Sequence, residues 1–488
     1  MTSTIPRRVA IAILVTLTTG LTSAPWVSAV VPPLVDPSHV PPDGVPGPER
    51  PMRQSNLCAR PIAAHNPEIS ERTASFVMLN VAQAWKYSTG NGVRVAVIDT
   101  GITPHPRLPV LPGGDYVSGG DGLSDCDAHG TVVASVIAAA PRGAAMPPPM
   151  PPISSSPRHE DLAFPDTAAE GSPGDGVVGV APHATLISIR QSSRAFEPVY
   201  LGSGDMEAGR KAGSLVTLAR AVVHAANLGA KVINVSVAAC VSAADPLDQQ
   251  SIGAAVWYAA TVKDAVVIAA AGNEGEDGCV GNPVSVSPDP QDPRGWGRVT
   301  TVSSPSWFTD YVLSVGAVDP SGAPIAKSLA GPWVGVAAPG VGIIGLSPQT
   351  GAAVNAYPAS RPGEKDAPFW GTSFAAAYVS GVAALVRAKF PDLSAQQVIS
   401  RLKETAHNPP NGTDNQVGYG VVDPVAALTF NVRRAPLVGA GKQTRLVSPP
   451  TAPPTADHRA RTFAFIFTGA VLAGMAFAAV IGRSRRQR

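Results

Sequence analysis

Charged residues are scarce in this sequence of 488 amino acids. Asp, Glu, Lys and Arg make up 15% of it, against about 25% in typical soluble domains. The formal net charge is only +2. A nucleic-acid partner is therefore not expected, because such proteins carry a strong positive charge that meets the phosphates.

Cysteine is also rare, with only Cys58, Cys126, Cys240 and Cys279 in the whole chain. Their spacings match no zinc-binding pattern. We find no recognisable calcium site or cofactor motif either, so no metal and no cofactor are expected. An even number of cysteines in an exported chain favours two disulfides over free thiols.

The N-terminus has the layout of a secretory signal. Arg7 and Arg8 precede an apolar stretch over residues 9–21, and the small residues Val27-Ser28-Ala29 follow. This pattern predicts a signal peptide over residues 1–29 that is cleaved after Ala29. An uncleaved N-terminal anchor is the alternative.

A second apolar stretch lies near the C-terminus. Residues 463–481 contain no charged side chain, and as a helix they would span about 28 Å, close to the hydrocarbon thickness of a bilayer. A buried core helix is the alternative, but a proline-rich linker (433–461) precedes this stretch and an arginine-rich tail (483–488) follows it. We therefore expect a single transmembrane helix over 462–482 with a cytoplasmic tail, and a body that lies outside the cell membrane.

The body divides into an arm and one large domain. Residues 30–79 are rich in proline and lack helical or strand periodicity, which predicts an extended arm. From residue 80 to 432, short β-branched runs alternate with Ala-rich helical segments such as 215–230; the runs are 93–99, 185–190, 231–237, 265–272, 312–318 and 333–340. This alternation predicts an α/β domain with a doubly wound, mainly parallel sheet and flanking helices.

A low-complexity insert interrupts the alternation at residues 141–176. Its composition cannot form a packed core, so it is either a disordered insert or a functional surface loop. We expect an exposed loop on the active-site side of the domain.

The stretch "FWGTSFAAAYVSGVAALV" places Thr372 and Ser373 between Gly371 and a run of small apolar residues. Two interpretations are open. The hydroxyls could cap a helix, or Ser373 could be a nucleophile at a helix start whose free N–H groups stabilise nearby negative charge. The second interpretation requires a His base, a group that orients it, and further oxyanion donors.

Three other segments supply such groups. Asp99 ends the strand 93–99, His129 and Gly130 begin a helical segment, and Asn273 follows the strand 265–272. Each has an ordinary alternative as a helix cap, a surface group or a turn residue. Together with Ser373, however, they occur in the chain order Asp, His, Asn, Ser of the subtilisin arrangement.

Over roughly residues 80–430 the sequence resembles the subtilisin-like serine proteases. The resemblance is carried by "VIDTGI", "HGT", "VGVAPHATLISIR", "AAAGNEG", "LSVGAVD", "APG" and "GTSFAAAYVSGVAAL". It implies an endopeptidase that acts on polypeptides, with Ser373 as nucleophile, His129 as base and then acid, and Asp99 as the group that orients His129. It also implies that Asn273 and the backbone N–H of Ser373 hold the oxyanion.

The sequence departs from that family at the substrate-pairing segment. Where a common pattern is Ser-Leu-Gly-Gly, this chain has Ser236, Val237, Ala238 and Ala239. The added Cβ atoms predict a narrower binding cleft. The residues after the nucleophile also differ, since Phe374 to Tyr378 contain neither the usual proline nor the usual histidine. Substrate specificity is therefore not carried over.

The overall layout resembles more narrowly the mycosins, membrane-anchored subtilisin-like proteases of mycobacterial type VII secretion systems. The resemblance implies a periplasmic protease domain on the inner membrane, association with the type VII membrane complex, and processing of a few secreted substrates. It also implies a structural role in that complex. A mainly structural component with a little-used triad is therefore the alternative function.

The strand pattern predicts how the cysteines pair. Cys240 and Cys279 each follow a strand of the predicted sheet, and neighbouring parallel strands bring their carboxyl ends together, so these two are expected to pair. Cys58 then pairs with Cys126 by elimination. That bond would attach the arm beside His129, so we expect the arm to remain part of the mature enzyme.

Overall fold

The computed structural model describes residues 30–142, 174–200, 212–245, 249–284, 287, 289–410, 412–432 and 474. Two units are distinguished, residues 1–434 and 435–488, and everything below concerns the first. The predicted signal peptide lies outside the described residues. So do the predicted linker and basic tail, and the predicted membrane span except for Gly474. Among the residues described, no helix is both long and apolar enough to span a bilayer.

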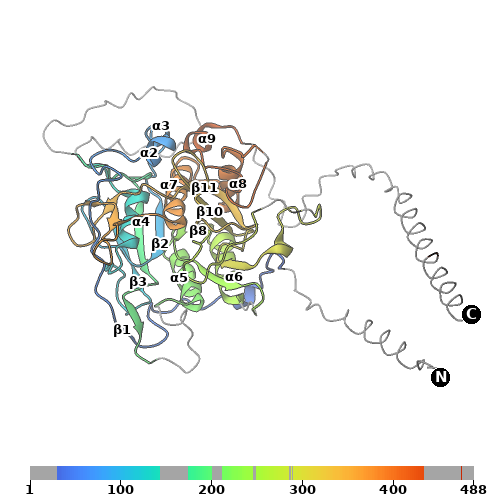
Figure 1. Ribbon diagram of the computed structural model, residues 1–488, viewed down its shortest axis with the longest axis horizontal. Coiled ribbons are helices and arrows are strands. Elements are labelled where there is room, and N and C mark those ends of the chain that lie inside the picture. The colour runs from blue at the N-terminus through green and yellow to red at the C-terminus, as the bar shows by residue number, and fades with distance from the viewer. Residues whose placement is uncertain are drawn as a thin grey trace, which may run out of the picture. The chain divides into compact units, whose positions relative to one another are not determined.

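A seven-stranded sheet forms the centre of the domain (Figure 1). Its strands, in spatial order, are β11 (Val334–Pro339), β10 (Val312–Val318), β8 (Val266–Ala270), β6 (Val232–Val235), β2 (Arg94–Asp99), β4 (Thr185–Arg190) and β3 (Val110–Asp115). Every neighbouring pair is parallel. The predicted parallel α/β sheet is confirmed, and six of its strands match the predicted β-branched runs.

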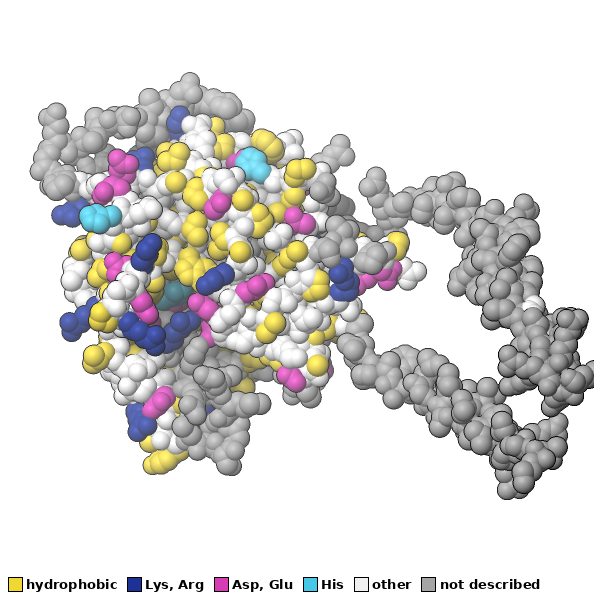
Figure 2. Space-filling model, in the orientation of Figure 1, with side chains coloured by type: hydrophobic (Ala, Val, Ile, Leu, Met, Phe, Trp, Pro, Cys, Tyr) yellow, Lys and Arg dark blue, Asp and Glu magenta, His cyan; other side chains and the backbone are white. Residues whose placement is uncertain are grey.

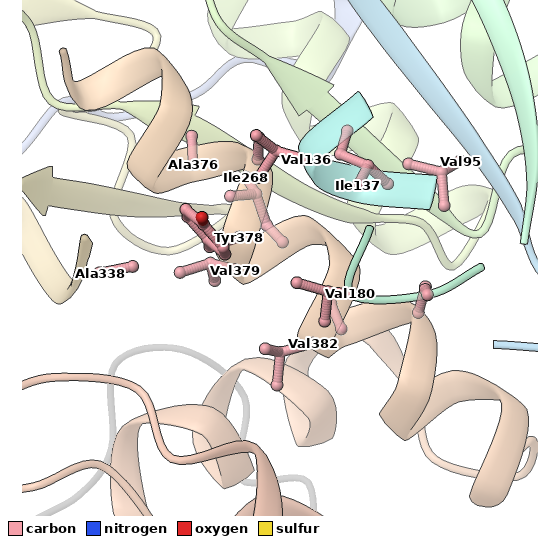
Figure 3. Close-up of a cluster of buried hydrophobic side chains, with 14 of the residues drawn as sticks. Val95, Val136, Ile137, Val180, Ile268, Ala338, Ala376, Tyr378, Val379 and Val382 are labelled. Carbon is pink, nitrogen blue, oxygen red and sulfur yellow. The ribbon is translucent and has the colours of Figure 1, made fainter. Parts of the chain in front are cut away.

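Helices cover both faces of this sheet because its central strands are apolar on both sides. On β2, Val95 and Val97 contribute to one buried cluster, and Ala96 and Ile98 to the other. The first cluster contains α4 (His129–Ala138), α7 (Thr372–Lys389) and α8 (Ala395–Glu404), and the second contains α5 (Leu215–Asn227) and α6 (Gln250–Trp257). Figure 3 shows the first cluster, where Val379 and Val382 of α7 lie near Val136, Ile137 and Val180.

Shorter elements complete the domain. The remaining helical segments are η1 (Pro37–His39), α2 (Ala74–Met78), α3 (Val81–Ala84), η3 (Tyr258–Val262), η4 (Trp296–Arg298) and α9 (Pro424–Thr429). The remaining strands form four antiparallel ribbons: β1 (Met52–Gln54) with β5 (Phe196–Pro198), β7 (Ala239–Ser242) with β9 (Thr301–Ser304), β12 (Gly345–Leu346) with β13 (Ala353–Val354), and β14 (Ala356–Tyr357) with β15 (Ala367–Pro368).

The N-terminal arm, residues 30–79, lies along the domain and contains little regular structure. Its β1 pairs with β5, and further along Ile62 pairs with Ala356. Asn355 fixes the next part, because its Oδ1 accepts from Ala64 N at 2.7 Å and its Nδ2 donates to the carbonyls of Ala64 and Pro67. The helical parts of the arm are the short η1 near its start and α2 at its end, where Thr73 is the N-cap residue.

The body of the predicted insert, residues 143–173, lies outside the described part of the chain, but its two ends are described. Arg107 joins them, because its Nε donates to Ala140 O at 2.6 Å while its Nη1 binds both carboxylate oxygens of Asp175. Both ends meet at the C-terminal end of α4, and this helix is about 15 Å long with His129 at its other end. The two ends of the insert therefore lie at the end of α4 away from His129, while the expected position of the loop itself falls outside the described residues. α4, which follows β3, carries the chain away from the carboxyl ends of the strands before the insert begins.

Candidate active site

The structure brings Asp99, His129 and Ser373 together, although they come from three separate elements. Asp99 ends β2, His129 begins α4 and Ser373 is the second residue of α7. His129 Nδ1 lies 2.7 Å from Asp99 Oδ1, and His129 Nε2 lies 2.8 Å from Ser373 Oγ. Figure 2 shows a histidine at the bottom of a hollow framed by charged side chains. In this geometry the imidazole can take a proton from the hydroxyl while the carboxylate fixes its other nitrogen.

The carboxylate of Asp99 is completely buried. Its Oδ1 accepts from Thr100 N at 2.6 Å as well as from His129. Its Oδ2 has no hydrogen-bond partner among the described residues. Gly130 permits this close approach, because a Cβ at that position would lie 2.1 Å from Gly101 O and 3.1 Å from Asp99 Oδ1.

A second buried carboxyl, Asp125, lies behind this pair and was not predicted from the sequence. Its Oδ1 accepts from Thr100 Oγ1 at 2.8 Å, and its Oδ2 accepts from both Thr131 N and Thr131 Oγ1 at 2.8 and 2.7 Å. Thr100 Oγ1 in turn accepts from Gly130 N. Asp125 therefore fixes the first turn of α4, from which His129 projects. Its position four residues before His129 is the signal that could have identified it.

The titration of these groups follows from their burial and charges. Burial raises the pKa of Asp125 to about 6, against the hydrogen bonds from Thr131 and Thr100. Burial alone lowers the pKa of His129, but the charge and hydrogen bond of Asp99, with the charge of Asp125, outweigh it and raise that pKa. The ring of Phe374 packs against the imidazole at 5.2 Å between centroids.

The start of α7 decides between the two interpretations of Thr372 and Ser373. The N-cap residue is Gly371, which has no side chain, and Thr372 and Ser373 are the first two residues of the helix itself. The cap interpretation is therefore wrong. The helix is instead held laterally, since Ser380 Oγ donates to Asn234 Oδ1 of β6 at 2.8 Å. Ser373 Oγ remains available to His129.

Asn273 lies directly beside Ser373. Its Oδ1 accepts from Thr372 N and Thr372 Oγ1, both at 3.0 Å, which fixes the orientation of its Nδ2. Gly371 has φ +144°, and a Cβ there would lie 3.2 Å from Asn273 Nδ2 and 3.3 Å from Ser373 Oγ. A side chain at this position would therefore crowd both the amide and the hydroxyl, and the glycine leaves the space between them open.

The predicted substrate-pairing residues Ser236, Val237 and Ala238 link β6 to β7. Ser236 is buried and its Oγ accepts from Asn234 Nδ2 at 2.6 Å, while Val237 and Ala238 are half-buried. Asn234 therefore connects this segment to α7, because its Oδ1 also accepts from Ser380 Oγ.

Both expected disulfides are present, Cys58–Cys126 and Cys240–Cys279. The first attaches the arm three residues before His129, and Ala59 N also donates to Cys126 O. The second joins β7 to the turn that follows Asn273. Each bond therefore supports one side of the site. Among the residues described, no cluster of His, Cys, Asp or Glu is arranged to hold a metal ion.

Comparison with known proteins agrees with this geometry. Residues 90–420 match the family model Peptidase_S8, the subtilase family. Mycosin-2 of Mycobacterium tuberculosis is 55% identical, with 96% of this chain and 95% of that protein aligned. The crystal structure of MycP1 from Mycobacterium smegmatis is 43% identical with a TM-score of 0.73, covering 86% of this chain and all of that one.

A chain in the structure of an intact ESX-5 inner membrane complex is 48% identical, with a TM-score of 0.73. It covers 92% of this chain and 99% of that one. The matches extend beyond the protease domain to most of the sequence. This chain is therefore a serine endopeptidase that belongs to the subtilase family and, within it, to the mycosins.

Proposed function

We propose that Asp99, His129 and Ser373 form the catalytic triad of this endopeptidase. The observation that carries the proposal is the continuous path from Asp99 Oδ1 through the imidazole to Ser373 Oγ, with contacts of 2.7 and 2.8 Å. Ser373 Oγ attacks the scissile carbonyl carbon while His129 Nε2 takes its proton. Asp99 holds the Nδ1 proton and stabilises the imidazolium that forms.

The tetrahedral intermediate places its negative oxygen between two donors, Asn273 Nδ2 and the backbone N–H of Ser373. The space beside Gly371 supports this assignment, because Asn273 Nδ2 and Ser373 Oγ both border it. When the intermediate collapses, the C–N bond breaks and His129 donates its proton to the leaving amine. Water then repeats the sequence on the acyl-enzyme and releases the second product.

The segment Ser236–Val237–Ala238 is proposed to pair with the substrate backbone. Its position after β6, the strand adjacent to β8 that precedes Asn273, supports this role. Ala238 and Ala239 carry side chains where the family pattern has glycine, so the cleft is narrow. We expect the enzyme to cleave only a few polypeptides, and to bind each of them in an extended conformation.

We further propose that the enzyme works at the inner membrane as part of a type VII secretion complex, with its protease domain in the periplasm and a C-terminal membrane anchor. There it processes secreted substrates. The similarity to a chain of the ESX-5 inner membrane complex over 92% of this chain supports this location. The same similarity favours a second role, in which the protein is a structural component of the complex.

The test is labelling of the purified full-length protein with a fluorophosphonate probe, with Ser373→Ala as control. We expect label on Ser373 in the natural protein and none in the variant. Absence of label from both would refute a competent triad. If Ser373→Ala stops substrate cleavage but secretion continues, while deletion of the whole chain stops secretion, the structural role is supported.

A further inference from the structure

Asn273 is already engaged in the resting site. Its Nδ2 donates to Glu276 Oε2 at 3.3 Å, and its Oδ1 is fixed by Thr372. One of the two amide protons of Asn273 therefore points toward a carboxylate, beside the position proposed for the oxyanion. Negative charge on that carboxylate opposes the negative charge that develops on the substrate.

Glu276 is in turn paired with Arg194 from the other side of the site. Arg194 Nη2 lies 3.4 Å from Glu276 Oε2 and 3.9 Å from Asp277 Oδ2. Arg194 follows β4 and Glu276 follows β8, and two strands, β2 and β6, lie between these in the sheet. The pair therefore crosses the carboxyl end of the strand that bears Asp99.

The backbone of Arg194 is held next to His129. Asp127, two residues before His129, accepts from Arg194 N at 2.7 Å and from Ser193 Oγ. The N-terminal arm adds a third contact, because Asn56 Nδ2 donates to Arg194 O at 3.1 Å. The charge of Arg194 opposes, without cancelling, the rise in the pKa of His129 that Asp99 and Asp125 cause. One end of the ion pair is thus anchored on the His129 side and the other on the Asn273 side.

We propose that the Arg194–Glu276 pair is a latch on the oxyanion amide, and that a substrate reacts faster once Glu276 is displaced from Asn273. The side chains are 63% and 37% exposed, so the latch is weak enough for a bound polypeptide to open it. This inference rests on the proposed function. It adds a residue that controls the reaction without touching the nucleophile.

The experiment measures the rate constant for fluorophosphonate labelling of the full-length protein and of Glu276→Ala. Removal of the competing carboxylate should raise the rate about fivefold, which corresponds to about 1 kcal/mol at 1.4 kcal/mol per tenfold. Glu276→Gln should give a smaller rise, because its uncharged oxygen can still accept from Asn273. Raising the salt concentration should accelerate the natural protein but not Glu276→Ala, since salt screens an exposed pair.

Two controls separate the latch from a general surface effect. Glu197→Ala breaks another exposed pair, Arg53–Glu197, which contacts no residue of the site, and should leave the rate unchanged. In an Asn273→Ala background, Glu276→Ala should no longer accelerate labelling, because there is no amide left to release. If Glu276→Ala fails to fold, Glu276→Gln and the salt series carry the test.

Three outcomes would decide against the latch. An unchanged or slower rate in Glu276→Ala, with the natural protein labelled, overturns the latch and leaves the triad standing. The same holds if the acceleration persists without Asn273. No label on any variant overturns the triad, and the latch with it.

Discussion

The two sides of Ser373 are built differently. On the His129 side, Asp99 and Asp125 are buried and together accept several hydrogen bonds from Thr100 and Thr131. On the Asn273 side, Thr372 fixes the amide oxygen, and the amide nitrogen donates to Glu276. Glu276 in turn pairs with Arg194, and both of these side chains are at least partly exposed.

This difference follows from what each side has to do. The imidazole needs one orientation and one tautomer throughout the reaction, so its support is buried and redundant. The oxyanion side has to admit a polypeptide, so its outer residues are exposed and easily displaced. The predictions below test whether the buried side controls the chemistry and the exposed side controls only access.

The largest effect is expected at the buried side, in Asp99→Asn. The amide cannot hold the Nδ1 proton as the carboxylate does, so kcat should fall about 10⁴-fold with little change in KM. Steady-state hydrolysis of a peptide substrate measures both. Asp319→Asn, on an exposed turn, is the control and should be normal. A loss of less than tenfold in Asp99→Asn would show that His129 is oriented by other groups.

The two disulfides allow a direct comparison of the sides. They close loops of 68 and 39 residues. Removal of either, by paired Cys→Ser substitutions, should lower the free energy of unfolding by about 4 kcal/mol, and the loss should be about 0.5 kcal/mol larger for the longer loop. Denaturant titration measures this loss. The effects on activity should differ, because Cys58–Cys126 supports the His129 side while Cys240–Cys279 supports the turn that carries Glu276.

We expect loss of Cys58–Cys126 to lower kcat, and loss of Cys240–Cys279 to change mainly the labelling rate attributed to the latch. Equal effects on both quantities would contradict the division between the two sides.

A smaller effect is expected for Asp125→Asn, and it should be visible in the pH profile. His129 acts as a base only when neutral, so activity falls as pH drops through its pKa, which the charge of Asp125 helps to raise. Without that charge the pKa of His129 is lower, and the acidic limb of kcat/KM should move to lower pH. The plateau should fall less than about tenfold, as for one lost buried hydrogen bond. An acidic limb at unchanged pH would show that the charge of Asp125 does not affect the pKa of His129.

The smallest effect is expected when residues 143–173 are replaced by a short Gly-Ser linker. Arg107 already joins Ala140 to Asp175, so the ends need no insert to meet, and the melting temperature should change little. Arg107→Ala, with the insert kept, is the contrast. It leaves Asp175 mostly buried without this partner and should destabilise clearly. A large drop in melting temperature for the linker variant would show that the insert is part of the folded core.

Most of the sheet was predictable because its strands are continuous apolar runs. The exception, β3 (Val110–Asp115), reads "VLPGGD" and lacks such a run. It is recognised only through its pairing with β4. The place where the insert begins was not predictable, because composition does not reveal that α4 carries the chain away from the carboxyl ends of the strands.

The site was predictable where chain order and motif coincide, as for Asp99, His129, Asn273 and Ser373. Arg194 and Glu276 were missed for a physical reason. Their importance lies in contacts between segments far apart in sequence, such as the 3.4 Å contact of Arg194 with Glu276. An isolated acidic or basic residue in a loop gives no sign of such a partner.

Thr372 has a consequence for the motion of the site. Its N and Oγ1 both donate to Asn273 Oδ1, and Gly272 N donates to its Oγ1. The residue before Ser373 is thus joined by three hydrogen bonds to Gly272 and Asn273. When α7 shifts by thermal motion, Asn273 shifts with it. The separation of amide and hydroxyl is therefore set within one small rigid unit, whatever the rest of the domain does.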